Sequence, residues 1–128
     1  MSDLNITPSA PHKNFESIKK VDENGIEYWE ARELMLLLGY AEWRNFEEVV
    51  GKAGQACMKS SQDVDNHFVK FTKMVEIGSN TVRQIKDYKL DRYACYLIAQ
   101  NGDPNKAEIA VAQTYFAIQT RRQEIFEQ

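Results

Sequence analysis

The chain has 128 residues, of which 43% are hydrophobic and 27% are charged, which predicts one soluble globular domain with a single hydrophobic core. Its formal net charge of -3 excludes a uniformly polybasic nucleic-acid binder, although it leaves room for a local basic segment. The sequence has no recognisable signal peptide and no apolar run long enough to cross a bilayer, so we expect a cytoplasmic protein with no membrane partner.

The first elements are an irregular leader and a hairpin. Residues 1–14 contain two of the three prolines and no hydrophobic period, which predicts a disordered arm or an expression leader. A folded domain is expected over residues 15–128. Apolar residues then flank the turn sequence DENG, in which Gly25 can adopt a positive φ, so residues 15–30 are predicted to form a hairpin.

Two helices are predicted next. Leu34, Leu37 and Leu38 share one face of a short helix, and Gly39 follows it as a cap. A second helix should begin near Glu42, because three-four spacing then relates a set of apolar residues: Phe46, Val49, Val50, Ala53 and Cys57.

The middle of the chain predicts a third helix and a second hairpin. Val64, Phe68, Phe71 and Val75 repeat at spacings of four, three and four, which is typical of a helix. The turn residues at 78–80 are followed by alternating apolar and charged residues, which predicts a hairpin around this turn.

The last two elements are predicted to be helices. Asp91 is suited to cap a helix over residues 92–101 that Gly102 ends, and Pro104 is suited to open a long C-terminal helix. The fold class predicted is therefore α+β, with helices packed against two short β-hairpins and a long C-terminal helix.

No residue pattern indicates catalysis, a metal site or a cofactor. His12 and His67 stand alone, and Cys57 and Cys95 match no metal-binding or redox spacing. The sequence has no nucleophile elbow and no glycine-rich phosphate loop. We therefore expect neither an enzyme nor a cofactor.

The two helices joined at Gly39 allow two interpretations. As a helix-turn-helix they would offer Arg32, Arg44 and Asn45 to DNA. As a simple helical corner they would only pack Leu34, Leu38 and Phe46 together. The glutamates around the turn favour the corner, because they would face phosphates unfavourably.

The second hairpin is the stronger candidate for nucleic-acid binding. Residues 66–92 contain six basic and three acidic side chains. Strand alternation should place Arg83, Lys86 and Lys89 on a solvent face, supported by Arg92, with Tyr88 able to stack on a base. An edge hairpin that uses lysines against aggregation is the alternative.

The C-terminal helix is the candidate for a protein interface. Its predicted apolar face is wide, and Ile118 and Ile125 lie on it together with Arg122, beside Arg121. Arg122 interrupts the apolar stripe, so it either reaches the domain edge or pairs with a carboxylate. These four residues are the predicted partner interface, which would include a homodimer.

Several motifs resemble one known family. They are ARELMLLLGY, NHF, IGSN, RYACYLIAQNGDP and AQTYFAIQTRRQE, and together they extend over nearly everything from Phe15 onward. The chain resembles the DNA-damage-inducible protein D family, which carries an N-terminal domain of the BRO type. The resemblance implies an α+β fold, DNA association, a place in the bacterial SOS response and a recombinase filament as a partner. It also implies that this chain is truncated relative to a full-length protein.

The function expected is a non-enzymatic domain of a DNA-damage response protein that associates with DNA or with a recombinase filament on DNA. The alternative is an antirepressor-like protein-protein or dimerisation module that does not bind DNA directly.

Overall fold

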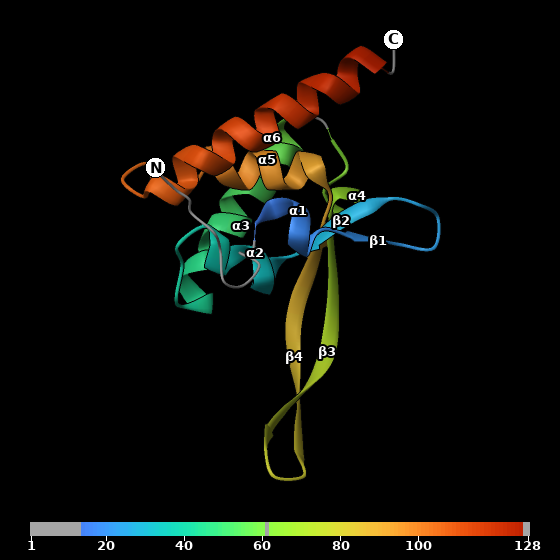
Figure 1. Ribbon diagram of the computed structural model, residues 1–128, viewed down its shortest axis with the longest axis vertical. Helices are drawn as coiled ribbons and strands as arrows, with labels where there is room; N and C mark the ends of the chain where they lie inside the picture. The colour runs from blue at the N-terminus through green and yellow to red at the C-terminus, as the bar shows by residue number, and fades with distance from the viewer. Residues whose placement is uncertain (1–13, 61, 127–128) are drawn as a thin grey trace, which may run out of the picture.

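The computed structural model describes residues 14–60 and 62–126, with side chains up to residue 118. It is an α+β fold in which helices gather at one end and a four-stranded antiparallel sheet in the order β1-β2-β4-β3 extends away from them (Figure 1). Both the α+β class and the long C-terminal helix predicted from the sequence are confirmed.

A single helical turn precedes the first hairpin. Helix α1, Phe15–Ile18, is capped by Asn14, whose side chain accepts a hydrogen bond from the Ser17 amide at 2.8 Å. Strands β1, Lys20–Val21, and β2, Glu27–Glu30, then form the predicted hairpin, and Gly25 in its turn has a φ of 80°. The hairpin is therefore confirmed, although its strands are shorter than the apolar pattern indicated. Of the predicted leader, residues 1–13 lie outside the described part.

Helix α2, Ala31–Leu37, and helix α3, Trp43–Lys59, form the predicted pair. Gly39 follows the first of them with a φ of 82°, a conformation that favours glycine. The predicted stripe of α3 is buried along its whole length: Phe46, Val49, Val50, Ala53 and Cys57. Leu34 and Leu38 of the preceding segment are also fully buried, so the pair packs as a helical corner around Phe46.

The predicted third helix is wrong beyond its first turn. Helix α4, Val64–His67, ends after four residues, and the chain continues as the long strand β3, Phe68–Gly78. This strand pairs with β4, Thr81–Leu90, over ten residue pairs. The second hairpin is therefore confirmed, and it is much longer than its sequence pattern indicated.

The last two helices cover the sheet end and close the core. Helix α5, Arg92–Gln100, begins where predicted, since the Asp91 side chain accepts a hydrogen bond from the Ala94 amide at 2.9 Å. Helix α6, Ala107–Phe126, begins three residues after Pro104, because Asp103 first holds a tight turn through the Asn105 amide at 2.9 Å. Its buried side chains, Ile109, Ala112 and Phe116, pack onto the central core.

The core is centred on Trp29 of β2. Its ring meets Phe116 of α6 edge to face at 5.3 Å between centroids, and its indole nitrogen donates to the Phe15 carbonyl at 2.7 Å. The buried aromatic ring thus has its one polar atom satisfied, as burial requires. Among the described helices, none combines the length and the apolar character needed to cross a bilayer.

Candidate nucleic-acid interface

Strands β3 and β4 form an arm that projects from the helices (Figure 1). Strand β2 pairs with β4 only at Leu90 and Lys89, so the rest of β4 has no neighbouring strand except β3. The turn at the far end contains Asn80 in the left-handed conformation, with a φ of 59°, which asparagine tolerates better than most residues. The pairing skips one residue between Glu76 and Gly78, which leaves Ile77 in a β-bulge.

A buried carboxylate anchors the base of the arm to the body. Asp87 of β4 is fully buried and accepts a hydrogen bond from the Arg32 amide, at the start of α2, at 3.1 Å. The Lys73 ammonium lies 2.8 Å from Asp87 and 2.9 Å from Glu30 of β2. The buried charge is thus compensated by a helix N-terminus and an ammonium.

The Lys73 ammonium is fully engaged by these two carboxylates. Burial alone lowers the pKa of Lys73, but its hydrogen bonds to Asp87 and Glu30 outweigh burial, and the pKa lies above its ordinary value. Lys73 is therefore a structural cation and not a free one.

A second set of contacts holds the opposite face of the arm against α3. The Lys86 ammonium lies 2.5 Å from a carboxylate oxygen of Glu47, and this hydrogen bond raises the pKa of Lys86. The Tyr88 ring packs against Trp43, with 6.2 Å between ring centroids, and the Arg32 guanidinium lies over the same Trp43 ring, 4.1 Å from its centre. The base of the arm is thus fixed on both faces.

The prediction that Arg83, Lys86 and Lys89 share one face is wrong. Side chains alternate along a strand, so the odd-numbered Arg83 and Lys89 lie on one face of β4, and Lys86 lies on the other. Arg83 is exposed, and Lys89 is half-buried with its ammonium 5.2 Å from the centre of the Tyr28 ring. Neither pairs with a carboxylate of the described residues.

Two further predicted residues are not free to meet a ligand. Tyr88 is only 8% exposed and packs inward, so its ring is not the open stacking surface that we expected. Arg92, on the first turn of α5, forms an ion pair with Glu27 of β2 and is mostly buried. Strand β2 supplies this carboxylate from a part of the chain 65 positions away, which the local sequence around Arg92 does not reveal.

The sequence pattern missed Lys70. It is exposed on β3 and lies opposite Tyr88, on the face of the arm that carries Lys86, and no carboxylate in the described part of the chain pairs with it. Because residues 64–75 were predicted to be a helix, Lys70 was not placed on the arm. The enrichment of FVKFTKMV in aromatic and β-branched residues, which favour strands, could have placed it there.

The helical corner contributes one exposed predicted cation. Arg44 is exposed near the start of α3 and has no carboxylate partner within the described residues. Arg32 is engaged by Trp43 and donates to the Lys86 carbonyl at 2.7 Å, so it is not available to DNA.

The predicted partner interface is only partly visible. Ile118 of α6 is 47% exposed, and Val111, two turns earlier on the same stripe, is 62% exposed. The side chains of Arg121, Arg122 and Ile125 lie outside the described residues.

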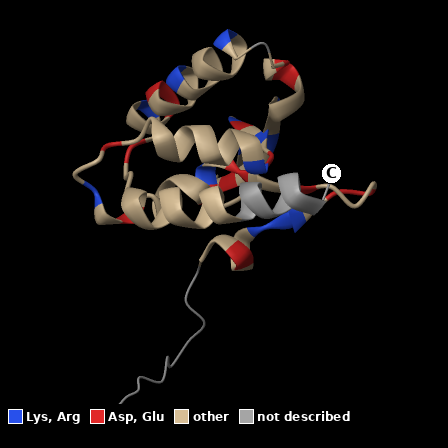
Figure 2. Ribbon diagram, turned by 90° about the horizontal axis from the view of Figure 1, so that it is seen from above, with Lys and Arg blue, Asp and Glu red and all other residues tan. Residues whose placement is uncertain are grey.

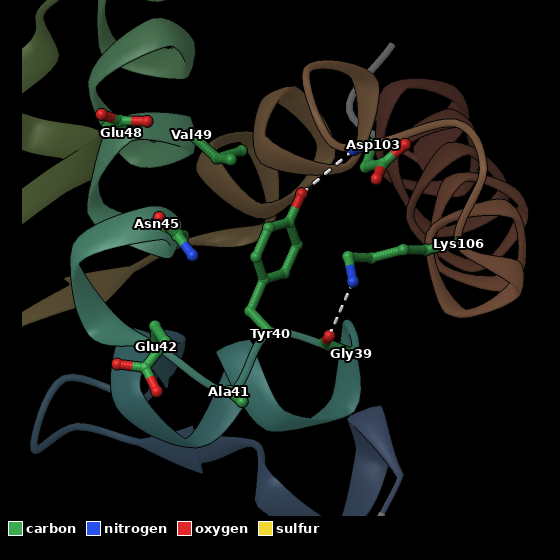
Figure 3. Close-up of a pocket in the computed structure, with 9 residues that line it drawn as sticks. All are labelled: Gly39, Tyr40, Ala41, Glu42, Asn45, Glu48, Val49, Asp103 and Lys106. Atoms are coloured by element: carbon green, nitrogen blue, oxygen red, sulfur yellow. Dashed lines mark hydrogen bonds between the residues drawn. The ribbon is translucent and has the colours of Figure 1, made fainter.

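A pocket of about 500 Å³ lies between the turn after α2, the start of α3 and the turn before α6 (Figure 3). The Lys106 ammonium donates to the Gly39 carbonyl at 2.9 Å, and the Tyr40 hydroxyl accepts from the Asp103 amide at 3.0 Å. The other charged side chains lining the pocket are carboxylates: Glu42, Glu48 and Asp103. A phosphate would be repelled here, so the pocket is not part of a polyanion surface.

The remaining titratable residues have structural roles. His67 lies 2.6 Å from the Asp91 carboxylate that caps α5. Cys57 and Cys95 are buried free thiols, and burial raises the pKa of both. Among the described side chains, those of residues 14–60 and 62–118, no group of three His, Cys, Asp or Glu is placed to hold a metal ion.

Charges of both signs are mixed over the helical body. Seen from above, lysines and arginines alternate with aspartates and glutamates instead of gathering on one side (Figure 2). Arg83 and Lys89 on one face of the arm, and Lys70 on the other, have no carboxylate partner among the described residues. The arm is therefore the best-defined candidate for contact with a polyanion.

The comparisons with known proteins agree with the sequence motifs. The profile of the BRO family, N-terminal domain, matches residues 17–117. The chain is 55% identical over 114 residues to DNA damage-inducible protein D of Escherichia coli (strain K12), which confirms the resemblance. The match includes 89% of this chain but 42% of that relative, so the chain spans less than half of the relative's length. No solved structure matches the chain significantly. The chain therefore belongs to the BRO family, whose N-terminal domain makes up most of its length.

Proposed function

We propose that this domain associates with DNA through the arm, as a non-enzymatic part of a DNA-damage response protein. The observation that carries the proposal is the arm itself, which stands clear of a mixed-charge body and presents Lys70, Arg83 and Lys89 without carboxylate partners among the described residues. A two-stranded ribbon with cations along it can follow a phosphate backbone.

The relative supports the biological setting of the proposal. The Escherichia coli protein is named for its induction by DNA damage, and the present chain shares more than half of its residues over the aligned part. A place in the SOS response and docking onto a recombinase filament on DNA are extensions of the same proposal, implied by the resemblance. In either setting the arm would meet an anionic surface, either phosphates or an acidic protein face.

The proposal is tested by removing the cations of the arm. Neutralising Lys70 and Arg83 together (Lys70→Gln, Arg83→Gln) should weaken DNA binding about tenfold or more at low salt. It should also make the fall of the logarithm of the DNA-binding constant with the logarithm of the salt concentration less steep. The slope should decrease in magnitude by about 2, one for each lost phosphate contact. Fluorescence anisotropy with single- and double-stranded oligonucleotides measures both quantities and also gives the strand preference.

The matched control neutralises two exposed lysines of α3, Lys52→Gln and Lys59→Gln, which changes the net charge equally far from the arm. This control should bind as the unaltered protein does. Equal weakening in both double variants would show a non-specific charge effect, and unchanged binding in the arm variant would overturn the proposal.

A second function is favoured by one specific observation, the exposure of Val111 and Ile118 on a single stripe of α6. We propose as the alternative that this stripe pairs with another subunit, and that the domain is a dimerisation module without direct DNA contact. Light scattering should then show a dimer that becomes a monomer in the Ile118→Asp variant, with no DNA binding at low salt in either form.

A further inference from the structure

The far end of the arm has a different chemistry from its base. We define the tip as residues 74–82, which contain one charged side chain, Glu76, and a set of strongly exposed apolar ones. Met74 is 61% exposed, and Ile77 and Val82 are each 57% exposed. Apolar side chains at the end of a projecting ribbon have no function in the fold, because none of them contributes to the core.

The tip is held in a defined position. Asp87 and Lys73 anchor the arm to α2 and β2, and Lys86 anchors its other face to α3. Beyond Lys73, β3 continues for five residues to Gly78, or about 17 Å at 3.4 Å per residue. The minor groove of DNA is about 7.5 Å deep, so the tip is long enough to reach its floor.

The charges next to the tip suit a groove with phosphates on both sides. Arg83 follows the tip directly on one face of the ribbon, whereas Lys70 lies on the other face, about 17 Å nearer the body, five residues along the ribbon. A ribbon that enters a groove meets one phosphate row on each face. Arg83 would meet one phosphate row at the mouth of the groove, and Lys70 would lie behind the groove, near the backbone on the other face.

From these observations we infer that the tip enters the minor groove of duplex DNA and inserts Ile77 between adjacent base pairs, so that the duplex bends. Ile77 is the residue in the β-bulge, which leaves it unpaired and exposed, and isoleucine is one of the apolar side chains that act as such wedges. Met74 and Val82, on the same ribbon, would cover the unstacked bases. This inference rests on the proposed DNA association and adds its target, a deformable duplex.

Two other ligands fit the tip less well. Binding of single strands by stacking uses aromatic side chains, and the tip contains none. A second copy of the chain would need a larger surface, because stable interfaces use about 20–30 residues on each side and the tip has far fewer.

The experiment uses a 20-base-pair duplex with 2-aminopurine beside a central TA step, since such steps are easily unstacked. The protein should raise the 2-aminopurine fluorescence severalfold, because insertion unstacks the probe, and a donor and acceptor on the duplex ends should report a bend. Ile77→Ala should lose most of the fluorescence increase and of the bend, with an affinity within about tenfold of the unaltered protein. Its melting temperature should not change, since Ile77 is exposed.

The matched control is Ile26→Ala, the same substitution at a 56% exposed isoleucine in the other hairpin. It should behave as the unaltered protein. If the protein binds the duplex with no fluorescence change, the insertion of Ile77 is wrong and the proposed DNA association stands. If the protein binds no DNA at low salt, both proposals are wrong. A protein dimer that Ile77→Ala weakens and Ile26→Ala does not would assign the tip to a second copy and overturn the inference.

Discussion

At the residue scale, Asp87 decides the position of the arm. It is the one buried charged side chain among the described residues, and it joins β4 to the start of α2 and to Lys73 of β3. Removing one partner of a buried pair leaves an uncompensated charge and typically costs about 3–5 kcal/mol. The sequence showed Asp87 only as one of several charges in a basic segment, because its partners lie on other elements.

The raised pKa of Lys73 gives a pH prediction. A group whose pKa is higher in the folded state stabilises the protein fully below its ordinary pKa, about 10.4, and this contribution is lost as the pH rises through the folded value. The free energy of unfolding of the unaltered protein should therefore exceed that of Lys73→Met by a constant amount from pH 6 to 9. The difference should shrink above about pH 10.4.

Urea unfolding at a series of pH values measures this difference. Lys52→Met, at an exposed lysine of α3, provides the comparison and should show little difference at any pH. A difference for Lys73→Met that grows above pH 10 would contradict the assigned role.

At the element scale, local signals predicted most of the fold. Capping by Asp91, the turn around Gly25 and the buried stripe of α3 each depend on residues close in sequence, and each was predicted correctly. Strand β3 was mistaken for a helix because Phe68, Phe71 and Val75 fit a helical spacing. Pairing with β4, which is not a local interaction, decided the outcome in favour of the strand.

Two glycines give a prediction: Gly102, which follows α5, and Gly51, which lies in α3. Gly102 does not have a positive φ, and its role is close packing, since a Cβ atom there would clash with Cδ1 of Ile109. Gly102→Ala should therefore lower the free energy of unfolding by about 1–3 kcal/mol, as overpacking does. Gly51→Ala, in an exposed position of α3 with no neighbour within 4 Å, should instead raise it by about 0.5–1 kcal/mol.

Thermal and urea denaturation of both variants test this pair. Equal effects of the two alanine substitutions would mean that helix propensity, and not the contact with Ile109, determines the cost at Gly102.

At the scale of the whole molecule, the charge pattern of the sequence indicated the segment that forms the arm. It did not indicate which cations of that segment pair with carboxylates. Five of the six cations between residues 66 and 92 lie on the arm, and Arg92 lies on α5. Lys73, Lys86 and Arg92 turned out to pair with carboxylates of other elements, and such pairs depend on the tertiary structure. The apolar tip was not predicted, because exposure of Ile77 and Val82 depends on how far the arm extends.

The central claim is that the arm, and not the helical body, binds DNA. Replacing residues 74–84 by Asn-Gly would join Lys73 to Ile85, its partner in the register, through a two-residue turn and would keep the contacts of Asp87, Lys73 and Lys86. The shortened protein should keep its fold, as the melting temperature and circular dichroism would show, because the removed residues contribute nothing to the core.

The most direct measurement is the affinity of this shortened protein for a DNA duplex at low salt, compared with that of the unaltered protein. We expect a loss of tenfold or more and a smaller salt dependence, since Arg83 and the tip are removed together. A folded, shortened protein that binds DNA with unchanged affinity and salt dependence would contradict the account.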